Sequence, residues 1–289
     1  MSLTRYIHAM GRGPGRARSL SRDEAAAAMR LILAGEAAPE AVGALLMLMR
    51  YRGETAEEIA GFVSALRDTL PAWEGPRPAL DWPSYAAGRT RGVPWFLLSA
   101  RLVAQAGVPV LLHGWNSHQN PIASVRGALD VAGIPAAEDM ADAARRLGDG
   151  GIAYLPLEAF SPRAFELLRL RDVLGLRSAI NTVLRVLNPA GAPASVQGVF
   201  HPPYRDLQAD AGALLGQARL TVIKGGTLTL VMTPFTALGE ISQPAMSAIA
   251  SDAAPEDAQG ELQGVLSSLQ AIAMIVTPLL MTSIFRVVT

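Results

Sequence analysis

The sequence predicts an α/β protein with three parts: an all-α N-terminal domain, a truncated parallel sheet with covering helices, and two apolar C-terminal helices. Residues before position 70 repeat apolar side chains at helical spacing. Short apolar runs then alternate with helical segments up to residue 226, and charged residues become sparse after that point. Strands separated by helices favour a parallel sheet with helices on both faces. We place the boundaries at 1–73, 74–225 and 226–289.

Capping residues mark the first helices. Ser21 precedes two acidic residues and begins a helix that ends at Gly35. A second helix is expected from Pro39 to Gly53, since proline suits a first turn and glycine a C-terminus. Thr55 and Glu58 have the spacing of a capping box for a third helix. A Pro-rich linker follows over 71–78.

The middle of the chain alternates between strand and helix patterns. In such sheets, sites lie at the carboxyl ends of the strands, where the connecting loops gather. Strands are expected within 79–82, 108–114, 151–157, 195–201 and 219–226, and helices within 94–107, 124–133, 162–175 and 204–218.

Composition limits the chemistry. The chain has no cysteine, which excludes disulfides and thiolate metal sites and favours a reducing compartment. Net charge is zero, so no polyanion partner follows from charge alone. Five arginines nevertheless gather in the glycine-rich first 22 residues. They indicate either a solvated, mobile terminus or an arm that contacts phosphate. They are Arg5, Arg12, Arg16, Arg18 and Arg22.

Several motifs resemble those of a known family. "LSRDEAAAAMRLILAGEAAPEAVGALLMLMRYRGETAEEIAGFVSALRDT", "AGVPVLLHGWNS" and "LRDVLGLRSAINTVLRVLNPAG" occur in order. They resemble the anthranilate phosphoribosyltransferases of glycosyl transferase family 3, whose relatives include a nucleic-acid-binding paralogue group. The resemblance covers about residues 3–225. It implies the nucleoside phosphorylase/phosphoribosyltransferase type of fold and a homodimer formed through the helical domain.

The resemblance also points to a degraded ligand site. A Gly-Thr-Gly-Gly-Asp loop holds diphosphate in the family, because glycines let backbone N–H groups approach phosphate. Here Ser84-Tyr85-Ala86-Ala87-Gly88 stands there, and Pro94-Trp95-Phe96-Leu97 replaces an Asn-x-Ser-Thr segment. Arg177 matches an arginine that contacts the aromatic acid substrate. The ligand-site candidates are Ser84, Tyr85, Gly88, His113, Gly114, Asn116 and Arg177.

The magnesium site that the resemblance implies is missing its acidic pair. That pair would follow the strand ending at Lys224, where carboxylates hold the cation that neutralises diphosphate. No acidic residue occurs between Lys224 and Glu240. We therefore expect no cofactor, and magnesium only for an active enzyme.

The C-terminal segment resembles a different protein class. From about Thr227 they are similar to the final transmembrane helices of major facilitator drug-efflux transporters. Residues 262–285 carry no charge and are long enough to cross a membrane, and residues 227–250 carry only Glu240. The alternative is a pair of buried soluble helices. If the tail is transporter-like, the chain is a fusion, natural or artefactual. Residues 1–225 would then be cytoplasmic, and the tail could associate with a membrane.

Three functions remain open at this point. One is a non-catalytic or divergent family member that binds single-stranded nucleic acid through arginines and aromatic side chains. Another is an active transferase acting on an aromatic or nucleobase-like acceptor, and the third is a fusion without function. The candidate nucleic-acid contacts are Arg12, Arg16, Arg18, Arg89, Arg91, Arg126 and Lys224, with Trp82, Tyr85, Trp95 and Trp115.

Overall fold

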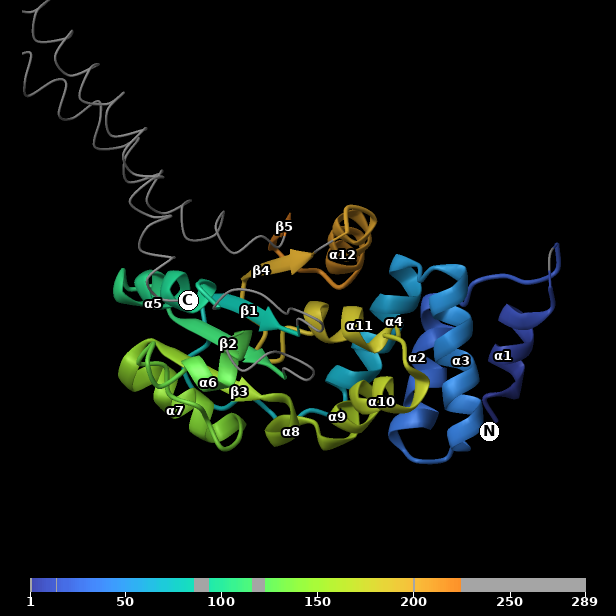
Figure 1. Ribbon diagram of the computed structural model, residues 1–289, viewed down its shortest axis with the longest axis horizontal. Helices are drawn as coiled ribbons and strands as arrows, with labels where there is room; N and C mark the ends of the chain where they lie inside the picture. The colour runs from blue at the N-terminus through green and yellow to red at the C-terminus, as the bar shows by residue number, and fades with distance from the viewer. Residues whose placement is uncertain (1, 14, 86–93, 116–122, 200, 225–289) are drawn as a thin grey trace, which may run out of the picture. The chain divides into compact units, whose positions relative to one another are not determined.

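The N-terminal part of the protein is a group of packed helices. A computed structural model describes residues 2–13, 15–85, 94–115, 123–199 and 201–224 (Figure 1). The first helices are α1 (Thr4–Gly11), α2 (Arg22–Leu33), α3 (Pro39–Arg52) and α4 (Ala56–Arg67). The predictions for α2, α3 and α4 are confirmed.

The caps form as their sequence spacing predicts. Ser21 and Glu24 close a capping box on α2, and Thr55 and Glu58 close one on α4. Glu58 is fully buried, and its second carboxylate oxygen accepts the backbone N–H of Leu20 at 2.9 Å. A carboxylate with two backbone donors can be buried at low cost. Glu58 therefore ties the chain before α2 to the start of α4.

The expectation of a mobile arginine-rich terminus is wrong for residues 4–11. This segment forms α1, and its Tyr6 and Met10 are 2% and 1% exposed. Glycines and arginines obscured the pattern, but two large apolar side chains four residues apart were enough to anchor one helical face.

The second half of the described chain is built on a parallel sheet. Its strand order is β3-β2-β1-β4-β5, and every pairing is parallel. This confirms the predicted α/β class. The strands are β1 (Leu80–Ser84), β2 (Val110–Gly114), β3 (Ile152–Pro156), β4 (Ala194–Val199) and β5 (Arg219–Lys224).

Alternating side chains of these strands feed two separate cores. Leu111 and Leu155 belong to a core shared with the N-terminal helices, whereas Leu112 and Tyr154 belong to a core on the opposite face. Figure 1 shows α5 on one side of the strands and α11 between β1 and the N-terminal helices. The remaining helices are α5 (Phe96–Gln105), α6 (Val125–Ala128), α7 (Met140–Gly150), α8 (Leu157–Phe160), α9 (Pro162–Arg169), α10 (Arg171–Leu174), α11 (Ile180–Val186) and α12 (Pro203–Leu214).

Some helices differ from the sequence prediction. The helix expected over 124–133 is a single short turn, α6, and the one over 162–175 is divided into α9 and α10 at Leu170. Helices α7, α8 and α11 were not predicted. The buried side chains of α11 include the polar Asn181 and Thr182 beside Ile180, and this mixture hides a helical apolar stripe.

The sheet has one narrow seam. β1 pairs with β2 over five residues and β4 with β5 over six, but β1 and β4 share only Leu80↔Ala194 and Asp81↔Ser195. Beyond this point the two strands are not paired. The direction in which successive strands are added to the sheet also reverses here, which is the topological switch point where α/β sheets open a ligand crevice.

The predicted transporter-like tail lies outside the described residues. Among the residues that the structure does describe, none belongs to a helix long and apolar enough to cross a membrane. The segments 227–250 and 262–285 therefore stay predictions.

Candidate functional site

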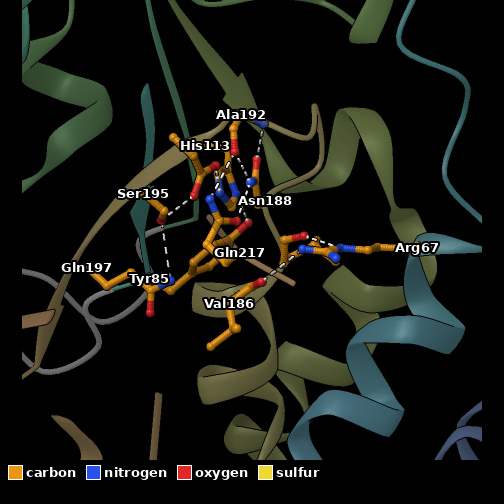
Figure 2. Close-up of polar contacts among 11 residues, drawn as sticks. Arg67, Tyr85, His113, Val186, Asn188, Ala192, Ser195, Gln197 and Gln217 are labelled. Atoms are coloured by element: carbon orange, nitrogen blue, oxygen red, sulfur yellow. Dashed lines mark hydrogen bonds and ion pairs between the residues drawn. The ribbon is translucent and has the colours of Figure 1, made fainter. Parts of the chain in front are cut away.

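A chain of buried polar side chains crosses the seam between β1 and β4 (Figure 2). Ser195 donates to Asp81 Oδ2 at 2.8 Å, and Gln197 donates to Ser195 Oγ at 3.3 Å. His113 Nε2 lies 3.1 Å from Asp81 Oδ1, and its Nδ1 lies 2.8 Å from the Tyr85 hydroxyl. All five residues are at most 2% exposed. This is an acid–imidazole–phenol chain without contact with bulk water.

The tautomer of His113 with its proton on Nε2 fits the contact with Tyr85, because Nδ1 then accepts from the Tyr85 hydroxyl. Nε2 lies close to Asp81 Oδ1, but neither atom has a hydrogen-bond partner among the described residues. Burial raises the pKa of Tyr85 well above its usual range, and the negative charge of Asp81 adds to that effect. Tyr85 therefore stays protonated and serves as the donor. Asp81, Ser195 and Gln197 were absent from the predicted site.

Ser84, Tyr85 and Gly114 lie together at the carboxyl ends of β1 and β2. Ser84 pairs with Gly114 in register. A Cβ at Gly114 would come within 2.1 Å of the Ser84 carbonyl oxygen, so only glycine fits this close approach. Arg185 Nη2 donates to the Tyr85 carbonyl at 3.4 Å. The tip of β1 is thus held through both the side chain and the backbone of Tyr85.

A group of cations lies next to this strand tip. Arg177, in the loop before α11, interacts with the charges of Arg171 and Arg50, and Arg185 interacts with the charge of Arg177. Burial is the main cause of a lowered pKa at Arg177, and it lowers the pKa of Arg185 to about 10. Repulsion from the neighbouring arginines lowers both pKa values further. Tyr204 of α12 also takes part in this electrostatic group.

Three residues that were not predicted from the sequence, Arg50, Tyr204 and Glu54, are joined by hydrogen bonds beside the cations. Arg50 of α3 donates to the Tyr204 hydroxyl, and that hydroxyl donates to Glu54 Oε2 at 3.2 Å. Burial raises the pKa of Glu54, and the hydrogen bond from Tyr204 partly opposes that shift. A guanidinium at Arg177 can hold a carboxylate bidentately. The group supplies positive charge around the position that the resemblance assigns to an aromatic acid.

The structure describes some of the other predicted residues and not the rest. His113 belongs to the buried chain, while Gly88, Asn116, Arg89 and Arg91 lie outside the described residues. Lys224 ends β5, and its side chain lies outside the description too. The structure therefore brings together Ser84, Tyr85, His113 and Gly114, with Arg177 near them through Arg185.

Three of the proposed nucleic-acid contacts have protein partners. Arg12 donates to His8, Arg18 pairs with Glu24 at 2.6 Å, and Arg126 pairs with Glu158. Arg16 is exposed. Nucleic-acid binding stays a prediction.

The predicted metal position cannot be compared with the structure, because the segment after Lys224 lies outside the described residues. Within the described part of the chain, no three or more His, Asp or Glu side chains gather into a group that could hold a metal ion.

A separate cavity of about 460 Å³ opens at the amino ends of β4 and β5. Its wall includes Arg67, Asn188 and Gln217. Arg67 donates to the carbonyls at the end of α11, at 2.7 Å to Leu187 and 3.4 Å to Val186. Figure 2 shows its guanidinium directed toward Val186. Asn188 and Gln217 bond each other at 2.7 Å. These side chains hold the loop between α11 and β4, which is a structural role.

Comparisons with known proteins follow the same two parts of the fold. A family described as glycosyl transferase family, helical bundle domain, matches residues 4–70. An anthranilate phosphoribosyltransferase of Xanthobacter autotrophicus is 33% identical over 210 residues, which are 72% of this chain and 60% of that protein. One of Rhizobium rhizogenes is 33% identical over 217 residues, covering 75% and 64%.

A solved structure agrees with these relatives. The crystal structure of anthranilate phosphoribosyltransferase from Thermus thermophilus superimposes with a TM-score of 0.65 at 27% identity, covering 78% of this chain and 66% of that one. The chain belongs to the anthranilate phosphoribosyltransferase-like family. The Saccharomyces cerevisiae structure in complex with PRPP and Mg has a TM-score of 0.63 at 17% identity and supports the fold.

Membership in this family comes with a difference in extent. The chain spans 60% and 64% of the two relatives named from Xanthobacter and Rhizobium. The predicted recognition is confirmed for the transferase-like part. The likeness of residues 226–289 to transporters gains no support from these relatives.

Proposed function

We propose that this chain is a divergent, non-catalytic member of the anthranilate phosphoribosyltransferase-like family that binds a small acidic ligand beside Arg177. The observation that carries the proposal is the state of Tyr85. Its side chain is buried on His113, and its carbonyl accepts from Arg185. The family's phosphate loop would begin here.

A diphosphate loop needs backbone N–H groups that can turn toward phosphate, and glycines permit this at low steric cost. Tyr85 instead anchors the loop entrance to the core, and the two alanines after it are less permissive. Phosphoribosyl transfer also needs charge neutralisation at the leaving diphosphate, and no acidic residue stands between Lys224 and Glu240 to hold a cation there. Both arguments favour loss of the donor reaction.

The acceptor side carries positive charge. Arg177, Arg185 and Arg50 converge electrostatically around Tyr204. The relatives' name refers to anthranilate, an aromatic carboxylate, and Arg177 stands where the resemblance expects such a contact. A carboxylate bound there would offset the repulsion among the guanidinium groups of Arg177, Arg185 and Arg50.

The opposing hypothesis is that the chain is an active transferase. The full 289-residue chain is incubated with phosphoribosyl diphosphate, magnesium and anthranilate, and the Xanthobacter relative is the positive control. We expect no product above the enzyme-free rate, no calorimetric heat with the donor, and saturable heat with benzoate or anthranilate. Product formation would overturn the proposal.

Nucleic-acid binding is tested in the same preparation. A labelled single-stranded DNA is titrated at several salt concentrations. Contacts with several phosphates would give a steep loss of affinity with salt. A salt-steep isotherm without benzoate heat would replace the acidic-ligand proposal with the nucleic-acid hypothesis.

A further inference from the structure

The cavity at the amino ends of β4 and β5 is large enough for a small organic molecule. Its volume of about 460 Å³ falls within the roughly 300–1,000 Å³ of ordinary ligand pockets. Its wall comes from three connections of the fold: the segment after α4, the loop between α11 and β4, and the turn between α12 and β5. A molecule in the cavity would therefore contact the last N-terminal helix and the start of two strands.

Arg67 is the one charged residue among the described residues that line this cavity. Its Nε and Nη2 donate to carbonyl groups at the end of α11, which fixes the guanidinium in place. Its Nη1 has no hydrogen-bond partner within the described chain and is not among the buried polar atoms. This nitrogen is therefore accessible and keeps its donors for a ligand.

The charge of Arg67 has no close acidic partner. Within the described residues, no carboxylate lies within ion-pair distance of Arg67. Burial lowers the pKa of Arg67, and the charge of Asp81 partly opposes that shift from a longer distance. The Asp81 carboxylate itself accepts from Ser195. An anion in the cavity would supply the contact that the described fold does not.

The rest of the wall has few polar groups to offer. Asn188 and Gln217 bond to each other and to the backbone of Ala192, at 2.7 to 3.0 Å. Three prolines, which have no backbone N–H, and two leucines form much of the remainder. They are Leu70, Pro71, Pro189, Pro193 and Leu215. This wall suits a hydrocarbon body rather than a strongly hydrated one.

We infer that this cavity binds a small monocarboxylate with an apolar body, its carboxylate on Arg67 and its hydrocarbon against the prolines and leucines. This is a second site, because Arg177 does not line the cavity. A guanidinium N–H forms a charge-assisted hydrogen bond with a carboxylate, which is stronger than a neutral one. A cationic ligand would be repelled by Arg67, and no acidic residue of the described wall would offset that repulsion.

Calorimetry of the full chain tests the inference with hexanoate and hexanamide, which share one hydrocarbon body and differ in charge. The wild type is expected to bind hexanoate about tenfold more tightly, the effect of one charge-assisted contact. Arg67→Gln should reduce that preference to about twofold. Ala72→Trp leaves Arg67 in place and puts an indole into the cavity wall, so hexanoate should bind about tenfold more weakly.

Two further variants are the controls. Arg145 is exposed on α7, and its partner Asp142 keeps an ion pair with Arg146 at 2.6 Å, so Arg145→Gln should keep the wild-type preference. Arg177→Gln should keep it as well. Thermal melts check that each variant folds. If Arg67→Gln does not fold, Ala72→Trp and the salt dependence of the wild-type preference decide, because an electrostatic preference shrinks with salt.

The outcomes separate this inference from the proposed function. Equal binding of the two probes, no binding of either, or an Ala72→Trp variant with wild-type affinity for hexanoate overturns the cavity site. Loss of hexanoate binding in Arg177→Gln, with retention in Arg67→Gln, also overturns it and assigns hexanoate to the site beside Arg177. Absence of benzoate and anthranilate binding overturns the acidic-ligand proposal and leaves the cavity site standing.

Discussion

Individual side chains decide what the strand tips can do. Tyr85 stands where a flexible loop begins in the family, yet it lies in the core with its hydroxyl on a buried imidazole. The sequence alone revealed the substitution but not its consequence, since the Asp81–His113 contact joins residues that are far apart in the chain. An aspartate in the apolar run "ALDW" was the available signal for a buried acidic partner.

Replacing Tyr85 with phenylalanine tests the importance of this contact for stability. The change removes the hydroxyl and leaves His113 Nδ1 buried without its partner. We expect the free energy of unfolding to fall by about 1–3 kcal/mol, the cost of an unsatisfied buried polar group. Urea denaturation measures it.

Tyr51→Phe is the control for that substitution. Tyr51 is 91% exposed, so its hydroxyl already has water as a partner. Its unfolding free energy should change by less than about 0.5 kcal/mol. Equal losses in the two variants would show that the Tyr85 hydroxyl has no special role.

Glu24 gives the stability of α2 a dependence on pH. The hydrogen bond from Arg18 lowers its pKa from 4.5 to about 2, and the Ser21 backbone N–H adds to this. A lowered folded-state pKa means that the stabilisation is complete above pH 4.5 and is lost as pH falls through about 2. Glu24→Gln should therefore destabilise the protein near neutral pH, and the deficit should shrink below pH 4.5.

Urea midpoints of the wild type and Glu24→Gln at neutral and acidic pH measure this difference. Glu36→Gln serves as the control, because Glu36 is exposed and follows the end of α2. A deficit of Glu24→Gln that stays constant across this range would contradict the assigned ion pair.

At the scale of elements, the starts of α2 and α4 were predictable and the packing of helices was not. Capping boxes depend on residues three positions apart, so Ser21 and Thr55 identified two helix starts. The close approach of α2 to α4 depends on Gly61, a residue that favours no helix by propensity. A Cβ on Gly61 would lie 2.3 Å from the Arg22 carbonyl oxygen and 2.8 Å from the Ala25 Cβ.

Gly61→Ala should separate α2 from α4. The added methyl group meets backbone, which cannot move aside as a flexible side chain would, and we expect a loss of about 1–3 kcal/mol in unfolding free energy. Gly43→Ala is the matched change on α3, because its Cβ would meet only Leu174 Cδ2, at an ordinary 3.8 Å. That variant should be neutral or more stable by up to about 1 kcal/mol. Thermal melts compare the two, and equal effects would contradict the packing argument.

At the scale of the whole molecule, the class of fold followed from the alternation of patterns, but the strand order did not. The order β3-β2-β1-β4-β5 places β1 in the centre, because β4 passes to its other side. No local pattern encodes that choice. The candidate ligand site was predicted from a resemblance through Arg177, whereas Arg50, Glu54 and Tyr204 come together only through tertiary packing. Their chain positions, far apart, gave no signal.

The two-residue seam between β1 and β4 has a mechanical consequence. The sheet consists of two parts, β3-β2-β1 and β4-β5. Two residue pairings and the hydrogen bond from Ser195 to Asp81 join them. Separating β1 from β4 would break two residue pairings, whereas separating any other neighbouring strands of the described sheet would break five or six. Under a pulling force, this sheet should therefore divide first between β1 and β4.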